Sequence, residues 1–184
     1  MRTLRKNRCV LALGLLLLFA TSSAFSYSVL THEAIIDSVW DTTIKGLLLK
    51  RFPDSTPEQL VEAHAYAYGG SIIQDMGYYP FGSKLFTDLL HYVRSGDFVI
   101  NLIKESQDLN EYAFSLGALA HYAADNTGHP LATNPGVSML YPKLRVEFGD
   151  RVTYADDASS HIKTEFAFDV TPFPTCPYFC DPQQ

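Results

Sequence analysis

Residue types that bind metal ions gather in one short stretch of the chain, H-Y-A-A-D-N-T-G-H-P. It begins at His121, and Asp125 follows four residues later, so on a helix both side chains lie on one face about one turn apart. Gly128 and Pro130 predict that this helix ends there, which leaves His129 at its end and near the same face. Adjacent imidazole and carboxylate groups are ligands of zinc and, less often, of iron or manganese. The same pair also occurs in helices as a solvated or hydrogen-bonded contact.

Histidines and carboxylates recur beside other predicted helices. His161 and Glu165 repeat the four-residue spacing within a helix expected over Asp156–Val170. His91 lies near the end of a helix expected over Ser83–Tyr92. The apolar residues of that helix are expected to face inward, and they are Leu85, Phe86, Leu89 and Leu90. Residues of the types that bind metal ions therefore occur on several separate predicted helices.

Two further candidate ligands precede these helices. Asp75 lies in a segment rich in glycine, proline and aromatic residues, 71–82, which predicts a packed loop. A carboxylate buried there is costly unless it is paired or binds a metal ion. His32 falls in the first turn of a helix expected over Leu30–Leu49, with Thr31 as the N-cap.

The remaining apolar spacing is also helical. A helix expected over Pro57–Tyr68 ends at Gly69 and Gly70, and it carries His64, to which we assign no chemical role. The other expected elements are helices over Asp97–Glu105 and Asn110–Ala124 and a loop with a short helix over Asn134–Phe148. No stretch alternates apolar and polar residues over enough positions to predict a strand. The sequence therefore predicts a single all-α domain.

The first 26 residues have the pattern of a secretory signal peptide. A basic start precedes an apolar run, Val10–Ala20, which is short for a membrane span. An uncleaved membrane anchor is the alternative. Cleavage is expected after Ser26, with Ala24 as the competing position, so Tyr27 becomes the first residue of a secreted or periplasmic protein. The expected divisions are a signal peptide over 1–26, a helical domain over 27–170 and an irregular tail over 171–184.

Charge limits the kinds of partner. Loss of the four basic residues in the signal peptide takes the formal net charge from −6 to −10. A chain this acidic does not hold nucleic acid by general electrostatics, so a phosphate-bearing substrate needs a local positive charge, which bound metal ions supply. Cys176 and Cys180 remain after cleavage, which permits one disulfide in the tail of an exported protein.

The order of these residues resembles the zinc-dependent phospholipase C family and the related single-strand-specific nucleases. The resemblance runs from Tyr27 to about Asp169. It is carried by H-x-x-x-D-x-x-x-H and H-x-x-x-E, preceded by Asp75 and His91 and by a histidine near the cleavage point. Such enzymes hold three zinc ions in an all-helical domain, and we expect the same here.

The resemblance also implies which residues hold each ion. The first zinc would be bound by Asp75, His91, His121 and Asp125. The second would be bound by His129, His161 and Glu165. The third would be bound by His32, by Asp125 as a bridge, and by the α-amino and carbonyl groups of Tyr27, where family members usually have Trp. An α-amino group titrates at about 7.7 to 8.0, so processing would create a ligand that can bind zinc near neutral pH.

The expected chemistry is hydrolysis of a phosphodiester. A hydroxide bridging two zinc ions is available near neutral pH as a nucleophile for in-line attack on phosphorus. The third ion can hold the leaving oxygen. Asp75 would orient or deprotonate the water, or serve only as a ligand. We therefore expect a phospholipase C-type enzyme acting on a phospholipid or another phosphodiester, with transient contact to a membrane surface and no stable nucleic-acid complex.

The chain departs from the family pattern at two places. The positions that form the choline pocket of well-known phospholipases hold Leu30, Met76 and Asp88, so no preference for phosphatidylcholine is expected. Only 19 residues follow Glu165, and we expect a shortened C-terminal part. The competing hypotheses are a nuclease on the same metal site, which would need an aromatic slot for a base, and a non-catalytic helical protein that binds zinc.

Overall fold

A computed structural model describes residues 29–170, and all regular structure in this range is helical. The elements are α2 (Val29–Val39), a π turn η1 (Trp40–Ile44), α3 (Lys45–Arg51), α4 (Pro57–Ile72), a 3-10 helix η2 (Ile73–Tyr78), α5 (Lys84–Tyr92), α6 (Ser95–Glu105), α7 (Leu109–Gly128), a π turn η3 (His129–Thr133), α8 (Asn134–Leu140), α9 (Pro142–Phe148) and α10 (Ala158–Asp169). The all-α prediction is confirmed. None of the helices in this range has the length and apolar character needed to cross a membrane.

Several predictions fall on residues outside the described range. The expected signal peptide, Tyr27 and the two cysteines of the expected tail are all in segments 1–28 and 171–184. These predictions stay predictions.

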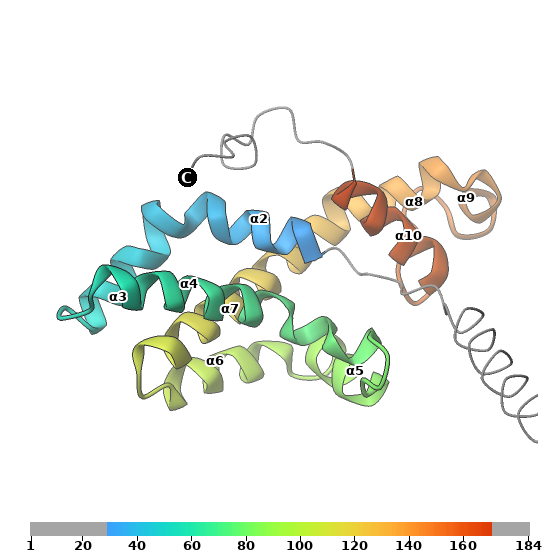
Figure 1. Cartoon of the computed structure of the whole chain (residues 1–184). Helices are drawn as coiled ribbons and strands as arrows, with labels where there is room; N and C mark the ends of the chain where they lie inside the picture. The colour runs from blue at the N-terminus through green and yellow to red at the C-terminus, as the bar shows by residue number, and fades with distance from the viewer. Residues whose placement is uncertain (1–28, 171–184) are drawn as a thin grey trace, which may run out of the picture.

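The core is built around α4 and α7, which lie against each other and against α2 (Figure 1). Gly70 and Gly117 make this contact close: a Cβ atom on Gly70 would lie 1.9 Å from the carbonyl oxygen of Phe114, and one on Gly117 would lie 2.0 Å from that of Ala67. The prediction that α4 ends at its glycine pair was wrong, because Gly70 serves helix packing and α4 continues to Ile72.

The first helical run is longer than predicted and contains a π turn in its middle. α2, η1 and α3 form one continuous run over 29–51, with the π turn η1 at its centre. The buried apolar residues on this run form one cluster with residues of α4 and α7, and they are Ile36, Trp40, Ile44 and Leu48. Thr31 is not the N-cap: its backbone N–H and its hydroxyl both donate to Asp169 on α10, at 2.9 Å and 2.6 Å. This contact fixes the start of α2 against the last helix.

The segment predicted as a packed loop contains the 3-10 helix η2, so that part of the prediction was wrong. A Cβ atom on Gly77 would lie 2.1 Å from the hydroxyl of Thr87, which shows how closely η2 packs on α5. The inward face of α5 is formed by Thr87, which is fully buried, and by His91 one turn later. Most of the residues predicted to face inward are exposed instead, namely Leu85, Phe86 and Leu89. Two polar side chains occupy the face that the sequence pattern assigned to apolar ones.

Helix α7 does not end where glycine and proline predicted. It continues through η3 into α8, so one helical run extends from Leu109 to Leu140 and includes Gly128 and Pro130. The π turn accommodates the proline, which lacks a backbone N–H. The segment expected to be a loop with a short helix forms α8 and α9. α8, α9 and α10 gather at one end of the molecule, on the opposite side from α3 (Figure 1).

Candidate metal centre

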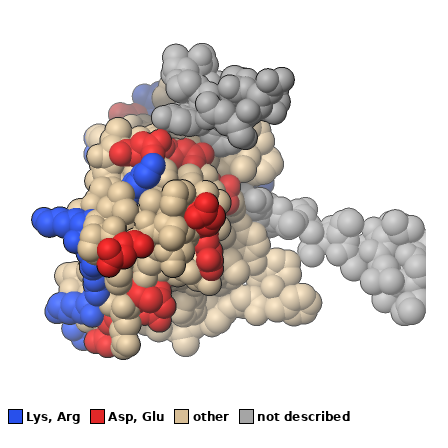
Figure 2. All heavy atoms as spheres, turned by 60° about the vertical axis from the view of Figure 1, so that its left-hand side comes forward, with Lys and Arg blue, Asp and Glu red and all other residues tan. Residues whose placement is uncertain are grey.

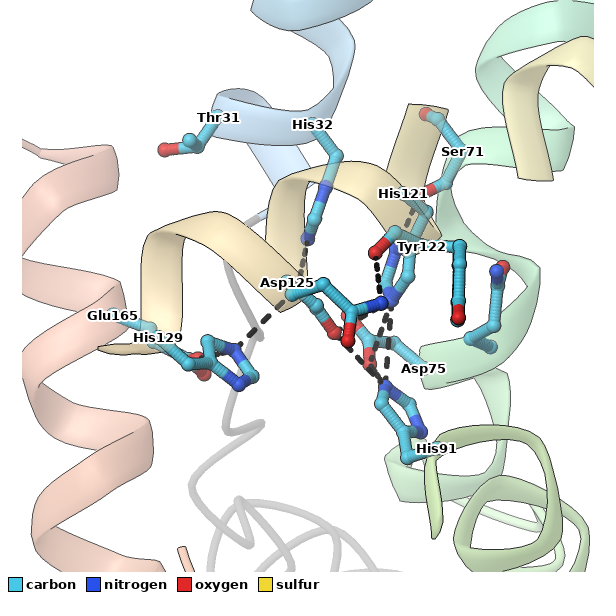
Figure 3. A network of polar contacts seen from close by, with 12 residues as sticks. Thr31, His32, Ser71, Asp75, His91, His121, Tyr122, Asp125, His129 and Glu165 are labelled. Atoms are coloured by element: carbon cyan, nitrogen blue, oxygen red, sulfur yellow. Dashed lines mark hydrogen bonds and ion pairs between the residues drawn. The ribbon is translucent and has the colours of Figure 1, made fainter. Parts of the chain in front are cut away.

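The candidate ligands of the described range converge from separate elements on one place between α2, α7, η2, α5 and α10 (Figure 3). Three groups have ligand atoms close enough to share a metal ion. They are Asp75, His91 and His121; His32, His121 and Asp125; and His129, His161 and Glu165. The structure thus brings together eight of the nine predicted ligands, and the ninth, Tyr27, lies outside the described residues.

The first group lies where η2, α5 and α7 meet. His91 Nε2 lies 3.2 Å from Asp75 Oδ1 and 3.4 Å from Asp125 Oδ2. His121 Nε2 lies 3.2 Å from the same Asp125 oxygen. The two Nε2 atoms are 3.3 Å apart. Two imidazole nitrogens and two carboxylates therefore surround one small volume.

Backbone carbonyls set the tautomers of these two imidazoles. His121 Nδ1 lies 2.7 Å from the carbonyl oxygen of Ser71, and His91 Nδ1 lies 2.9 Å from that of Thr87. A carbonyl only accepts, so each Nδ1 carries a proton and donates it. In the neutral rings both Nε2 atoms then present lone pairs to each other and to the carboxylates. This arrangement needs a cation, and the donor set of imidazole and carboxylate fits zinc.

Asp125 joins the groups because its two oxygens face different imidazoles. Oδ2 faces His91 and His121, whereas Oδ1 lies 3.4 Å from His129 Nε2 and 3.7 Å from His32 Nε2 (Figure 3). Burial alone would raise the pKa of Asp125, but the contacts with His121 and His91 hold the pKa of this carboxyl well below its usual range. Asp125 is therefore ionised, and its position is the one expected of a bridging carboxylate.

The group of His129, His161 and Glu165 joins η3 and α10. Glu165 Oε1 lies 2.8 Å from His129 Nε2 and 3.1 Å from His161 Nε2. Burial acts to raise the pKa of Glu165, and the hydrogen bonds from His129 and His161 lower it below its usual value. His161 is almost fully buried, and its Nδ1 has no hydrogen-bond partner among the described residues. Its ring is therefore held by the contact of Nε2 with Glu165 and by packing against His129 and Tyr154.

His32 approaches the centre from α2. Its ring stacks on that of His121, with the centroids 4.1 Å apart and 21° between the planes. Burial, and then the neighbouring His121, lower the pKa of His32, so its imidazole is neutral near neutral pH. A neutral imidazole is the form that binds a metal ion.

Three tyrosines form part of the wall, and one of them, Tyr154, has no signal in the local sequence pattern. Tyr92 and Tyr154 stack at a centroid distance of 5.9 Å, and Tyr78 lies 6.0 Å from Tyr154. All three line the small cavity at the ligands. Tyr92 follows a candidate ligand directly, which is a weak signal, whereas Tyr154 precedes α10 with no recognisable spacing.

The sixth histidine, His64, lies outside these groups. Its Nε2 lies 3.1 Å from Asp37 Oδ1, and its ring stacks on Trp40 at a centroid distance of 4.0 Å. Tyr68 donates a hydrogen bond to the same aspartate. The contacts of His64 link α2, η1 and α4, so its role is in packing.

A family model described as zinc dependent phospholipase C matches residues 31–174. The chain belongs to this family. No curated protein and no solved structure matches the chain significantly. The matched range of this phospholipase C family member contains every candidate ligand from His32 to Glu165, whereas Tyr27 precedes it. The assignment of individual ligands and of Asp75 as a catalytic residue stays a prediction, although the geometry fits it.

Proposed function

We propose that the protein is an exported, zinc-dependent phosphodiester hydrolase of the phospholipase C type. The observation that carries this proposal is that Nε2 of His91 and Nε2 of His121 face each other at 3.3 Å beside the ionised carboxylate of Asp125. Zinc bound there supplies positive charge for a phosphate group and lowers the pKa of water toward 7. Family membership supports hydrolysis of phosphodiesters.

Three sets of residues would hold three zinc ions. The first set is Asp75, His91, His121 and Asp125. The second set is His129, His161 and Glu165. The third set is His32, Asp125 and the backbone of Tyr27 after removal of a signal peptide. Asp125 belongs to the first and third sets, and one of its oxygens also lies near His129.

Asp75 is suited to act on the attacking water. Its carboxylate is buried on η2, and its Oδ1 faces His91 Nε2 at 3.2 Å and His121 Nε2 at 3.9 Å. From this position it would accept a hydrogen bond from a water molecule and orient its oxygen toward phosphorus. The water oxygen would lose a proton as it forms the new bond to phosphorus. The bond between phosphorus and the diacylglycerol oxygen would break, and the diacylglycerol oxygen would take up a proton.

An exposed apolar surface favours a phospholipid substrate. It consists of Phe81, Leu85 and Leu89, on α5 and the loop before it, and α5 also carries His91. Phe81 is fully exposed and has a φ of 70°, so its apolar ring projects from the loop. These apolar side chains, on the helix that carries His91 and on the loop before it, would contact the membrane surface from which the substrate comes.

The alternative is a single-strand nuclease or nucleotidase on the same metal site. Tyrosines around the cavity could stack on a base, and this observation keeps the alternative open. The overall negative charge argues against it. On the face shown in Figure 2, acidic side chains are spread over the middle, and the basic ones gather mostly along one edge.

The proposal is tested by zinc analysis combined with parallel assays on phospholipid vesicles and on single-stranded DNA. We expect about three zinc ions per chain and zinc-dependent release of diacylglycerol. Faster cleavage of the DNA would favour the nuclease, and bound zinc without turnover of either substrate or of an aryl phosphodiester would favour a non-catalytic zinc protein. Amino-terminal sequencing of exported protein is expected to begin at Tyr27 and tests the export step.

A further inference from the structure

A carboxylate on the last described helix binds the backbone at the start of the first one. Asp169 is the last residue of α10, and its Oδ1 accepts hydrogen bonds from the Thr31 backbone N–H at 2.9 Å and the Thr31 hydroxyl at 2.6 Å. Its Oδ2 accepts a longer one, 3.4 Å, from the N–H of Leu30. Both N–H groups belong to the first turn of α2, where backbone donors have no partner within the helix. Asp169 therefore does for α2 what an N-cap side chain does, from a distant part of the chain.

The local sequence of neither helix accounts for this carboxylate. The first turn of α2 contains no acidic residue, so Asp169 supplies the negative charge that a helix N-terminus favours. At the C-terminal end of α10 the same charge is unfavourable, and the last turn of α10 has no basic residue to offset it. The contact with α2, and not the end of α10, therefore favours an aspartate at this position.

The face of α10 that carries Asp169 also carries two candidate zinc ligands. His161, Glu165 and Asp169 follow one another at intervals of four residues, so their side chains lie near one face in successive turns. His161 and Glu165 are buried at the centre, and Asp169 reaches α2. One helix thus holds both a ligand group and the start of α2.

The other end of the contact lies beside the candidate ligand on α2. Thr31 directly precedes His32, whose Nε2 lies 3.7 Å from Asp125 Oδ1. Neighbouring residues of a helix keep a fixed spacing, so a shift of Thr31 shifts His32 with it. Tyr27, whose amine belongs to the same proposed ligand set, precedes Leu30 by three residues, which span at most about 11 Å. The position of the helix start therefore limits where both ligands can lie.

We propose that Asp169 is a positioning residue for the third zinc ion, because it holds the start of α2 where His32 and the amine of Tyr27 can share that ion. This inference rests on the proposed function, which includes that ion and its ligand set. Asp169 itself lies outside all three ligand groups. It acts through hydrogen bonds to the first turn of α2, so a neutral amide at this position should serve nearly as well.

The test compares zinc content in variants of the full, zinc-loaded protein at a buffered free zinc concentration. Asp169→Ala removes both acceptor oxygens, and zinc content should fall from about three to about two ions per chain. Asp169→Asn keeps one acceptor oxygen, and its zinc content should stay near that of the wild type. Glu105→Ala is the matched control, because Glu105 is the exposed acidic last residue of α6 and belongs to no ligand group.

Zinc titration separates a weakened site from a damaged fold. In Asp169→Ala the third ion should need about tenfold more free zinc than in the wild type, at the low end of the 10–100-fold losses that follow changes to outer-shell partners. Excess zinc should restore the third ion, and the other two ions should bind as in the wild type. Loss of all three ions together, or wild-type zinc affinity in Asp169→Ala, would overturn the proposal.

Thr31→Val provides the decisive measurement if Asp169→Ala does not fold. It removes the hydroxyl that donates at 2.6 Å and keeps both the backbone N–H and the shape of the side chain. The third ion should then bind about fivefold more weakly, the effect of one lost hydrogen bond. In that case, wild-type zinc affinity in Thr31→Val would overturn the proposal.

Turnover separates the failure of this inference from the failure of the proposed function. Zinc-dependent hydrolysis of phospholipid vesicles, with unchanged zinc binding in Asp169→Ala, would overturn the inference and leave the phospholipase proposal standing. A third zinc ion whose binding depends on Asp169, without hydrolysis of any phosphodiester, would support the inference and overturn the phospholipase.

Discussion

The Nε2 atoms of His91 and His121 lie 3.3 Å apart, although 30 positions separate the two residues in the chain. The proton on each ring is directed to a backbone carbonyl on the opposite side, so the facing atoms are both acceptors in the neutral rings. Without zinc, only protons can relieve this repulsion. The stability of the metal-free protein should therefore depend on pH differently from that of the zinc-loaded protein.

The first prediction concerns pH and metal removal. Burial alone would lower the pKa of His91, but hydrogen bonds to Asp125 and Asp75 raise the pKa to about 10. The pKa values of His121 and His129 are also raised, by Asp125 and Glu165 respectively, against the effect of burial. A raised pKa stabilises the folded state below the unfolded value of about 6.5, and this stabilisation is lost as pH rises toward 10.

The metal-free protein should therefore have a lower Tm at pH 9 than at pH 6.5. Zinc replaces the protons, so the rise in Tm on adding zinc should be larger at pH 9. Thermal unfolding with a chelator and with zinc at both pH values measures the effect. A gain in Tm that is equal at the two pH values would contradict protonation of these imidazoles.

The second prediction is that Asp125→Asn removes most of the activity. The substitution keeps the shape of the side chain but deletes the charge that faces four imidazoles. We expect zinc content to fall and turnover to drop by about 100-fold or more, since changes even to outer-shell partners cost 10–100-fold. Metal analysis and turnover of an aryl phosphodiester give the two readings.

His64→Ala is the control for this variant, because His64 packs on Trp40 away from the ligands. Its turnover and zinc content should stay within about twofold of wild type, although stability should fall by about 1 kcal/mol from lost packing. If His64→Ala were the more damaging change to activity, the ligand assignment would be wrong.

The third prediction is that Gly70→Ala weakens both the fold and the metal site. The added Cβ would meet the backbone of Phe114 at 1.9 Å, and separating α4 from α7 would move the neighbouring Ser71 carbonyl that holds His121. Stability should fall by about 3 kcal/mol, and zinc affinity should fall with it. Gly46→Ala, on exposed α3 with nothing within 4 Å of the new Cβ, should instead stabilise by about 0.5–1 kcal/mol. Denaturant unfolding of both variants measures the contrast.

The fourth prediction concerns the exposed apolar surface. Replacing Phe81 and Leu85 together by serine should reduce hydrolysis of vesicles about tenfold, because the apolar area available to the membrane falls. Hydrolysis of a soluble short-chain diester should stay unchanged. Val61→Ser removes an exposed apolar residue on α4 and should leave both activities intact. Equal losses on both substrates would indicate damage to the centre instead of a lost membrane contact.

The sequence predicts those parts of the site that depend on helical periodicity. The pairs His121 with Asp125 and His161 with Glu165 share a helix face because residues four apart always do. Helical periodicity alone predicts no contact between α7 and α10. Only the family resemblance predicted that these pairs lie close to residues distant in the chain.

Other features were mispredicted because packing overrides local preference. The glycines of α4 and the proline of η3 are signals for helix ends, yet close helix contact and a π turn use them within helices. The apolar pattern of α5 predicted a buried face, but Thr87 and His91 occupy it.

The uninterrupted run of α7, η3 and α8 has a consequence for how this site can change. It carries His121, Asp125 and His129, so each of the three ligand groups has at least one residue on this helical run. Each residue of a helix turns it by about 100° and advances it by about 1.5 Å, so a single insertion after Asp125 would swing His129 away from Glu165. An insertion or deletion within this run therefore changes the position of one ligand group relative to another. Insertions and deletions that keep the metal centre intact are expected in the loops between helical runs.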